Sequence, residues 1–186
     1  FPRTVMEGIA LLIPYELAGY NEINVRSNCT RMVIAPITPE ALVTRQPAFE
    51  AYADEHPQLK RVRLYGDTYS YQTSDLISRQ KYRKLAIYNE FYRHIDTEHQ
   101  LTCLLTEAGG SLDIGLAICR KLKGFTQEEQ EIIEFLRPHL GQAYVNMRNA
   151  ARCAEELRLL SDSMGDLNAS AVQLDVEGRI KRISER

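Results

Sequence analysis

The chain has no tryptophan and no excess of charge of either sign. It carries 23 Lys and Arg against 25 Asp and Glu over 186 residues, which gives a formal net charge of -2. Such a balance provides no bulk electrostatic attraction to nucleic acid or to an anionic membrane. We therefore expect that any contact with DNA is made by a segment outside this chain.

Long apolar runs and a signal peptide are also missing. The longest mostly apolar stretch, residues 9–13, is far too short to span a bilayer. We expect a cytoplasmic protein that makes no membrane contact. The sequence begins at Phe1 without methionine and ends in the charged run GRIKRISER, so we also expect a fragment of a longer protein.

The cysteines and glycines form none of the common cofactor motifs. No GxGxxG or GxxxxGK[ST] segment occurs, which excludes the usual dinucleotide and P-loop signatures. The cysteines contain no CxxC pair, so neither a zinc site nor a disulfide framework is indicated; they are Cys29, Cys103, Cys119 and Cys153. We expect no cofactor and no bound metal.

Apolar spacing and prolines delimit the first elements. Residues 3–13 place their apolar side chains on one helical face, and Pro14 ends the predicted helix. Residues 19–25 and 31–37 are rich in β-branched side chains and predict two short strands, most simply a hairpin.

The next predicted element is a helix that begins beside a proline. Thr38 followed by Pro39 is typical of an N-cap and a first helical residue. The helix is expected to cover residues 40–55 and to stop before Pro57, with Pro47 bending or splitting it.

In the middle of the chain, the sequence pattern changes from aperiodic to helical and then to strand-like. Residues 64–75 are polar, rich in tyrosine and aperiodic, which predicts a surface loop that leads to an N-cap at Thr73 or Ser74. Residues 81–95 predict an amphipathic helix, and residues 99–120, two apolar runs joined by Ala-Gly-Gly-Ser, predict a β-hairpin. Strand pairs followed by helices indicate an α+β fold with an antiparallel sheet.

The C-terminal helix is the best-specified element. Thr126 and Glu129 form a capping-box pattern that starts it. An apolar seam with alternating spacings of three and four follows: Ile133, Leu136, Leu140, Ala143, Met147, Ala150, Ala154 and Leu157. The first half is expected to pack on its own domain. Beyond Met147 the flanks are charged, which favours a partner helix, so we expect a homodimer formed through Met147, Ala150, Ala154 and Leu157.

Pro138 lies inside this helix, where it removes one backbone hydrogen bond and crowds the preceding turn. We expect it to re-aim the helix, marking the bend between a sensing and a connecting half.

Several segments together resemble a known family. The run FTQEEQEIIEFLRPHLGQAYVNMRNA, with Leu136 to Leu140 at its centre, is similar to the end of the GAF-like sensory domain of some LuxR-type transcriptional regulators. The segments EHP at residues 55–57, TSD at 73–75, LAIYNEFYR at 85–93 and EHQL at 98–101 agree in order. The resemblance covers roughly residues 5 to 150.

The resemblance implies a GAF-like antiparallel sheet flanked by helices, with a long C-terminal signalling helix. It implies three parts: a sensory domain over residues 1–145, a signalling and dimerisation helix over 146–168, and a truncated PAS-like connecting hairpin over 169–186. It further implies a cytoplasmic sensor whose C-terminal helix-turn-helix, outside this chain, binds DNA. Since the acyl-homoserine-lactone receptors of the family use tryptophans in their ligand pocket, we do not expect that ligand here.

Candidate catalytic and metal-binding groups do not converge in the sequence. His94, Asp96, Glu98 and His99 crowd one corner, but no second ligand cluster completes a coordination shell. His139 lacks a nominated nucleophile and an orienting carboxylate. Cys103 and Cys119 fall on the two strands of one predicted hairpin, where they are possible cross-strand neighbours, and we interpret both as small apolar fillers. We expect no catalytic residue.

The tyrosines are the best candidates for ligand contact. Tyr69 and Tyr71 lie in the predicted loop, and Tyr88, Phe91 and Tyr92 lie on the following helix. A pocket lined by aromatics with a few hydroxyls suits a small organic ligand. For the last three residues packing in the core is the favoured interpretation, whereas for Tyr69 and Tyr71 ligand contact and idle surface are evenly balanced.

These observations predict a ligand-sensing and dimerising domain of a bacterial transcriptional regulator. Three alternatives remain open: the same module attached to another output such as a kinase, an enzyme acting at an aromatic cleft, and a ligandless domain that only dimerises. A convergent set of titratable residues favours the enzyme, and a filled core without a pocket favours the ligandless domain.

Overall fold

The structure is a computed structural model that describes residues 1–24, 26–27, 30–36, 40–66, 68–106, 112–166, 172–174 and 177–183. The chain forms two compact units, Phe1–Gln142 and Ala143–Arg186. The first unit contains the five-stranded sheet and the helices that pack on it, and it holds the candidate site.

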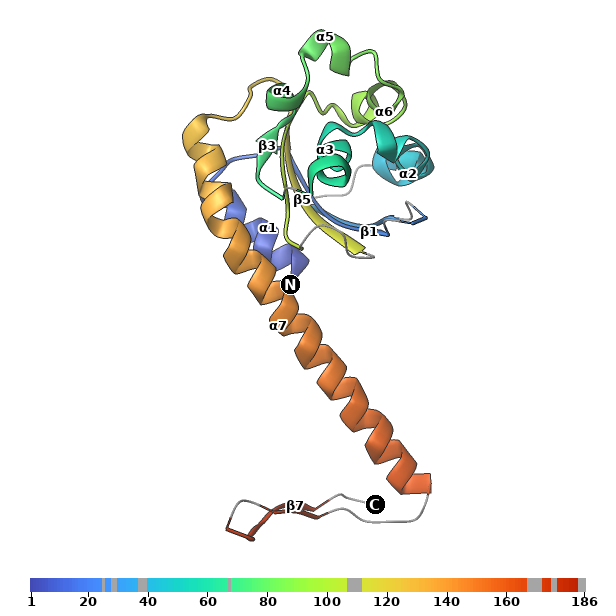
Figure 1. The fold of residues 1–186 in the computed structure, drawn as a ribbon, viewed down its shortest axis with the longest axis vertical. Helices are drawn as coiled ribbons and strands as arrows, with labels where there is room; N and C mark the ends of the chain where they lie inside the picture. Colours follow the sequence, from blue (N-terminus) through green and yellow to red (C-terminus); the bar gives the residue numbers. More distant parts are fainter. Residues whose placement is uncertain are drawn as a thin grey trace. The chain divides into compact units, whose positions relative to one another are not determined.

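A five-stranded antiparallel sheet is the centre of the first unit (Figure 1). Its strand order is β2-β1-β5-β4-β3, with β1 at Leu17–Asn24, β2 at Thr30–Ala35, β3 at Tyr71–Gln72, β4 at His99–Leu104 and β5 at Leu112–Arg120. The pairing of β1 with β2 and of β4 with β5 confirms both predicted hairpins and the α+β class. The Ala-Gly-Gly-Ser connection at residues 108–111 lies outside the described residues.

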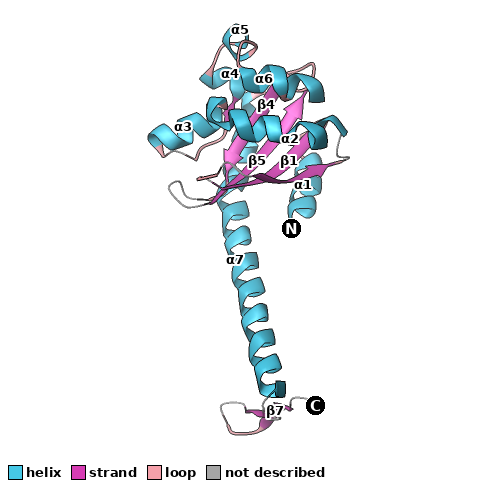
Figure 2. Cartoon of the chain, turned by 90° about the vertical axis from the view of Figure 1, so that its right-hand side faces the viewer, coloured by secondary structure: helices cyan, strands magenta, loops and turns pink. Residues whose placement is uncertain are grey.

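Helices cover both faces of this sheet (Figures 1 and 2). One face carries α1 (Pro2–Ala10) and the first turns of α7 (Gln127–Asp166). The other carries α2 (Glu40–Tyr52), α3 (Pro57–Tyr65), α6 (Ala86–Glu90) and the 3-10 turns η1 (Ala53–Glu55) and η2 (Tyr92–Ile95). Two short helices, α4 (Thr73–Leu76) and α5 (Arg79–Tyr82), complete the layer.

The predicted helix over residues 40–55 is present as α2 followed by η1, and Pro47 lies inside α2 without splitting it. The predicted cap at Thr38 and Pro39 lies outside the described residues. Helix α3 was not predicted. Its signals are Pro57 at its first position and Gly66 at its end, where φ is 69° and a side chain is disfavoured.

The segment between α3 and β4 corrects two predictions. The expected loop contains an edge strand, β3, and the cap of α4 is Gln72, whose N–H donates to Asp75 Oδ2 at 2.9 Å, rather than Thr73 or Ser74. The expected single helix over residues 81–95 is broken into α5, α6 and η2 because Leu85 adopts an extended conformation and Phe91 leaves helical geometry. Because of these breaks, the aromatic side chains of the three short elements pack together in one buried cluster.

The two hairpin cysteines are not cross-strand neighbours. Cys103 lies opposite Leu116, whereas Cys119 lies opposite Gln100. Since successive side chains of a strand point to opposite faces, the two thiols lie on opposite sides of the sheet. Both are buried and free, and burial raises the pKa of each to about 12.

Helix α7 continues through Pro138 as one α-helix. Within the second unit, the predicted seam residues Met147, Ala150, Ala154 and Leu157 are all exposed in the single chain. Strands β6 (Val172–Leu174) and β7 (Ile180–Ile183) pair antiparallel, which confirms the predicted terminal hairpin.

Candidate functional site

A cavity of about 70 Å³ lies between the sheet and the layer that α2, α3 and η2 form. Its walls are mainly aliphatic and aromatic, with Leu17, Ile23, Ile34, Leu42, Phe49 and Leu59 among them. Among the described residues that line it, none is Asp, Glu, Lys or Arg. An apolar enclosure with a few polar groups is the usual form of a small-molecule site.

Three polar side chains, His56, Gln100 and Tyr82, form a hydrogen-bonded chain beside the cavity. His56 is the N-cap of α3, and its Nδ1 accepts from the Leu59 N–H at 3.4 Å. The protonated Nε2 therefore faces Gln100 Oε1 at 3.3 Å, and Gln100 Nε2 donates to the Tyr82 hydroxyl at 3.3 Å. Burial is the main cause that lowers the pKa of His56, to about 4, so the imidazole is neutral near pH 7.

The predicted aromatic residues do not share one cavity. Phe91 and Tyr92 line it, each almost fully buried. Tyr88 is buried in the same aromatic cluster, but its hydroxyl donates to Glu98 Oε1 at 2.5 Å. Tyr69 is 57% exposed, and Tyr71 lies on the edge strand, so these two lie apart from the cavity. Ligand contact by any of the five remains a prediction.

His56, Gln58 and Gln100 are polar residues of this region that the sequence did not nominate. Gln58 lines the cavity and is 3% exposed. His56 lies in the EHP segment, which was noted only as part of a resemblance. Gln100 lies in the EHQL segment, likewise noted only as part of a resemblance, and Gln58 carried no signal, because a single glutamine in a helix is not distinctive.

A strap of residues 68–72 connects the cavity wall with α7. Gln58 Nε2 donates to the Tyr69 carbonyl at 3.1 Å. The next residue, Ser70, donates its N–H to Glu134 Oε2 at 2.8 Å, and its carbonyl accepts from Gln130 Nε2 at 2.9 Å. The strap therefore includes the edge strand β3 and is held by hydrogen bonds to α3 on one side and to α7 on the other.

Arg137 strengthens the α7 side of the strap. Its guanidinium donates to Thr68 Oγ1 at 3.1 Å and to Glu134 Oε1 at 3.0 Å, and it lies 5.6 Å from the centre of the Tyr69 ring. Burial raises the pKa of Glu134, but hydrogen bonds from Arg137 and from the Ser70 N–H outweigh it, and the net pKa is lowered. Glu134 is thus held as a carboxylate.

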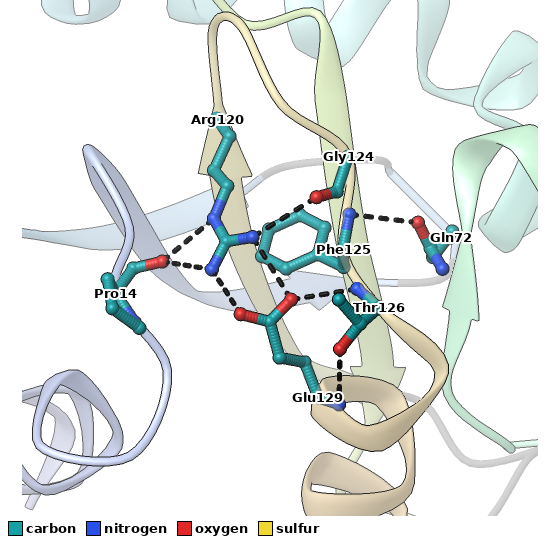
Figure 3. Close-up of polar contacts among 7 residues, drawn as sticks. All are labelled: Pro14, Gln72, Arg120, Gly124, Phe125, Thr126 and Glu129. Atoms are coloured by element: carbon teal, nitrogen blue, oxygen red, sulfur yellow. Dashed lines mark hydrogen bonds and ion pairs between the residues drawn. The ribbon is translucent and has the colours of Figure 1, made fainter.

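A second attachment lies where α7 begins (Figure 3). The guanidinium of Arg120, at the end of β5, donates to both carboxylate oxygens of Glu129, at 2.6 and 3.0 Å. It also donates to the Pro14 carbonyl at 2.6 and 2.8 Å and to the Gly124 carbonyl at 3.1 Å. One side chain therefore joins the sheet, the segment after α1 and the start of α7.

The residues between β5 and α7 complete this attachment. The Thr126 N–H donates to Glu129 Oε2 at 2.8 Å and the Glu129 N–H donates to Thr126 Oγ1 at 3.2 Å, which confirms the predicted capping box. The Phe125 N–H donates to Gln72 Oε1 at 3.2 Å (Figure 3), so the start of α7 is also tied to the strap. Hydrogen bonds from Arg120 lower the pKa of Glu129.

The two acidic side chains near residues 94–99, Asp96 and Glu98, have structural partners. Glu98 accepts from Tyr88, Arg79 and Arg83. Within the described ranges, no group of three or more His, Cys, Asp or Glu is arranged to hold a metal ion. In the same ranges, no helix is both long and apolar enough to cross a bilayer.

Solved structures share this architecture, although no family model and no curated protein matches the sequence. The chain is similar to the VqsR LBD domain from Pseudomonas aeruginosa, with a TM-score of 0.55, 15% identity, and coverage of 74% of this chain and 80% of that one. It is also similar to the photoproduct state of GAF3 from Slr1393 of Synechocystis sp. PCC6803, with a TM-score of 0.58, 16% identity, and coverage of 81% and 94%.

A GAF domain/HD domain protein from Geobacter sulfurreducens gives a TM-score of 0.50 at 15% identity, covering 79% of this chain and 91% of that one. These likenesses, together with the five-stranded antiparallel sheet and its helical layers, establish the class of fold: an α+β domain of the GAF type with a long C-terminal helix. The predicted fold class is therefore confirmed.

Proposed function

We propose that this chain is a ligand-sensing and dimerising regulatory domain of a bacterial transcriptional regulator. A small molecule binds in the cavity, and its binding changes how the first unit holds α7. A C-terminal module outside residues 1–186 binds DNA. The domain acts by binding and population shift rather than by catalysis.

The observation that carries this proposal is the uncharged cavity on one face of a sheet whose other face holds the start of a long helix. The strap and the Arg120 attachment offer a physical connection between them. The resemblance of residues 136–140 and 88–92 to LuxR-type regulators supports a transcriptional output. The exposed seam at Met147 and Leu157 supports a symmetric partner helix.

Filling the cavity provides the test. Ala117 lines it from β5, and Ala117→Leu adds apolar volume there. Ala51, exposed on α2, provides the matched control as Ala51→Leu. A panel of small uncharged metabolites is screened by thermal unfolding, because a ligand that binds only the folded state raises the Tm.

We expect at least one compound to raise the Tm of the wild-type chain and of Ala51→Leu but not of folded Ala117→Leu. The same compound should change the reporter output of the full-length regulator. Sensing through this cavity is contradicted if the compound also raises the Tm of Ala117→Leu. It is contradicted as well if no compound of the panel raises the Tm of the wild-type chain.

A further inference from the structure

The cavity's composition restricts the charge of its occupant. Its described walls contain no ionisable acid or base other than the neutral His56, the tyrosine Tyr92 and the thiols Cys103 and Cys119. Burial raises the pKa of Tyr92, Cys103 and Cys119, so all three stay protonated near pH 7. A charged ligand would lose its hydration without gaining an ionic partner. An uncharged ligand incurs no such cost.

The hydrogen-bonding capacity of the cavity's histidine is already used within the protein. His56 accepts from the Leu59 N–H through Nδ1 and donates to Gln100 through Nε2. Gln100 in turn donates to the Tyr82 hydroxyl. This chain of bonds stabilises the layer above the sheet and leaves the histidine occupied at both ring nitrogens.

Gln58 differs from these residues. Its amide nitrogen donates to the Tyr69 carbonyl at 3.1 Å, whereas its Oε1 accepts no hydrogen bond from the part of the chain that the structure describes. The side chain is 3% exposed and lines the cavity. A buried carbonyl oxygen without a donor is costly, and such groups are normally satisfied by an internal group, a water molecule or a ligand.

The cavity's size restricts the occupant further. A cavity of about 150 Å³ holds benzene, whereas this one measures about 70 Å³. The space therefore suits a molecule, or the end of a molecule, with only a few non-hydrogen atoms. A branched aliphatic skeleton matches the Leu, Ile and Phe side chains around it.

We infer that the cavity binds a small, uncharged, mainly apolar molecule that donates one hydrogen bond to Gln58 Oε1. This inference rests on the proposed sensing function and names the chemistry that the cavity recognises. An alcohol or a primary or secondary amide has the required O–H or N–H donor. Gln58 is then the residue that selects the ligand, and the nitrogen of the same amide already donates to the strap that leads to Ser70 and Glu134.

Three probes share a branched skeleton of four non-hydrogen atoms, and together they test separately the need for a hydrogen-bond donor and the need for an uncharged molecule. 2-Propanol has a donor, acetone has none, and acetate is charged. Each is titrated at millimolar concentration into the chain, since such small molecules bind weakly. Methyl resonances of Ile23, Ile34 and Leu59 report on the cavity, and the Ser70 amide resonance reports on the strap.

We expect 2-propanol to bind about tenfold more tightly than acetone, as one additional buried hydrogen bond predicts, and acetate to leave the cavity resonances unmoved. Gln58→Met should remove the preference for 2-propanol, while Gln127→Met, an exposed glutamine change on α7, should preserve it. The Ser70 amide should shift with 2-propanol in the wild type.

Equal affinity for 2-propanol and acetone in the wild type overturns the inference, yet it leaves sensing through the cavity intact. The same holds if a preference for 2-propanol survives in Gln58→Met. If none of the probes moves the cavity resonances, the inference is also overturned, and the separate test with Ala117→Leu decides whether larger ligands use the cavity. The comparison of probes in the wild type does not depend on the folding of any variant.

Discussion

Arg120 Nη2 lies 2.6 Å from Glu129 Oε1, and this ion pair joins the last residue of β5 to the first turn of α7. The side chains are only 10% and 19% exposed. The pair thereby holds the first turn of α7 against the sheet. Because the Pro14 carbonyl accepts from the same guanidinium, the segment after α1 is held as well.

Removing this attachment should destabilise the domain. Arg120→Ala leaves Glu129 without its ionic partner and the Pro14 carbonyl without its donor, and we expect a loss of about 2–4 kcal/mol in the free energy of unfolding. Urea unfolding followed by circular dichroism measures it. Arg158→Ala, which removes the exposed pair with Glu155, should leave the midpoint unchanged; equal midpoints for both variants would contradict the role of Arg120.

His56 should make stability depend on pH. Its pKa is about 4 in the folded chain and near 6.5 when unfolded, so only the unfolded chain gains a proton as the pH falls between these values. Stability is therefore complete above pH 6.5 and declines by roughly 3 kcal/mol toward pH 4. His56→Asn retains an oxygen acceptor at the α3 N-cap but removes this titration.

The check is to compare urea unfolding at pH 7 and pH 4.5 for the wild type and His56→Asn. We expect the variant to lose less stability than the wild type over this interval. His99, whose pKa is lowered mainly by burial, is present in both proteins and cancels in the comparison. Identical losses in the two proteins would mean that His56 does not titrate as described.

Gly141 is required by the close approach of α7 to the end of β4. A Cβ added there would lie 2.5 Å from the Leu105 carbonyl oxygen, a backbone atom that cannot move cheaply. We expect Gly141→Ala to lower the free energy of unfolding by about 1–3 kcal/mol. Gly8→Ala, in a helix with open space around the new Cβ, should instead raise it by about 1 kcal/mol. Chemical unfolding should therefore give a lower free energy of unfolding for Gly141→Ala and a higher one for Gly8→Ala than for the wild type.

The strap should loosen when its α7 partner is removed. Glu134→Ala takes away the acceptor of the Ser70 N–H, and we expect hydrogen exchange at Ser70 to become about tenfold faster. Glu131→Ala, an exposed change three residues earlier on the same helix, is the control. Unchanged exchange at Ser70 in Glu134→Ala would show that the strap is held by other contacts.

Introducing acidic side chains into the predicted seam tests dimerisation through the C-terminal half of α7. Ala150→Glu combined with Ala154→Glu places carboxylates in the predicted seam, where they would be buried against the partner helix. Analytical ultracentrifugation should show a dimer for the wild type and a monomer for the double variant. Asn149→Glu, beside the seam, should remain dimeric. A wild-type chain that is monomeric throughout the accessible concentration range would remove the proposed interface.

Features that depend on local spacing were predictable from the sequence. Alternating apolar residues specified the β4–β5 hairpin, and Thr126 with Glu129 specified the start of α7, because period-two burial and helix capping involve residues close in the chain. The paired strands followed by helices also indicated the α+β class. The breaks at Leu85 and Phe91 were not predictable, because tertiary packing of the aromatic cluster overrides the helical periodicity of residues 81–95.

The sequence by itself determined which residues share a face of the β4–β5 hairpin, where α7 begins, and the α+β class of the fold. Only the tertiary structure decided which faces meet. It placed His56 beside Gln100 and Ser70 beside Glu134, residues separated by 44 and 64 positions. It also separated Tyr69 and Tyr71 from the cavity that Phe91 and Tyr92 line. Periodicity carries no information about such partners, because the contacts arise only when distant elements pack around a common core.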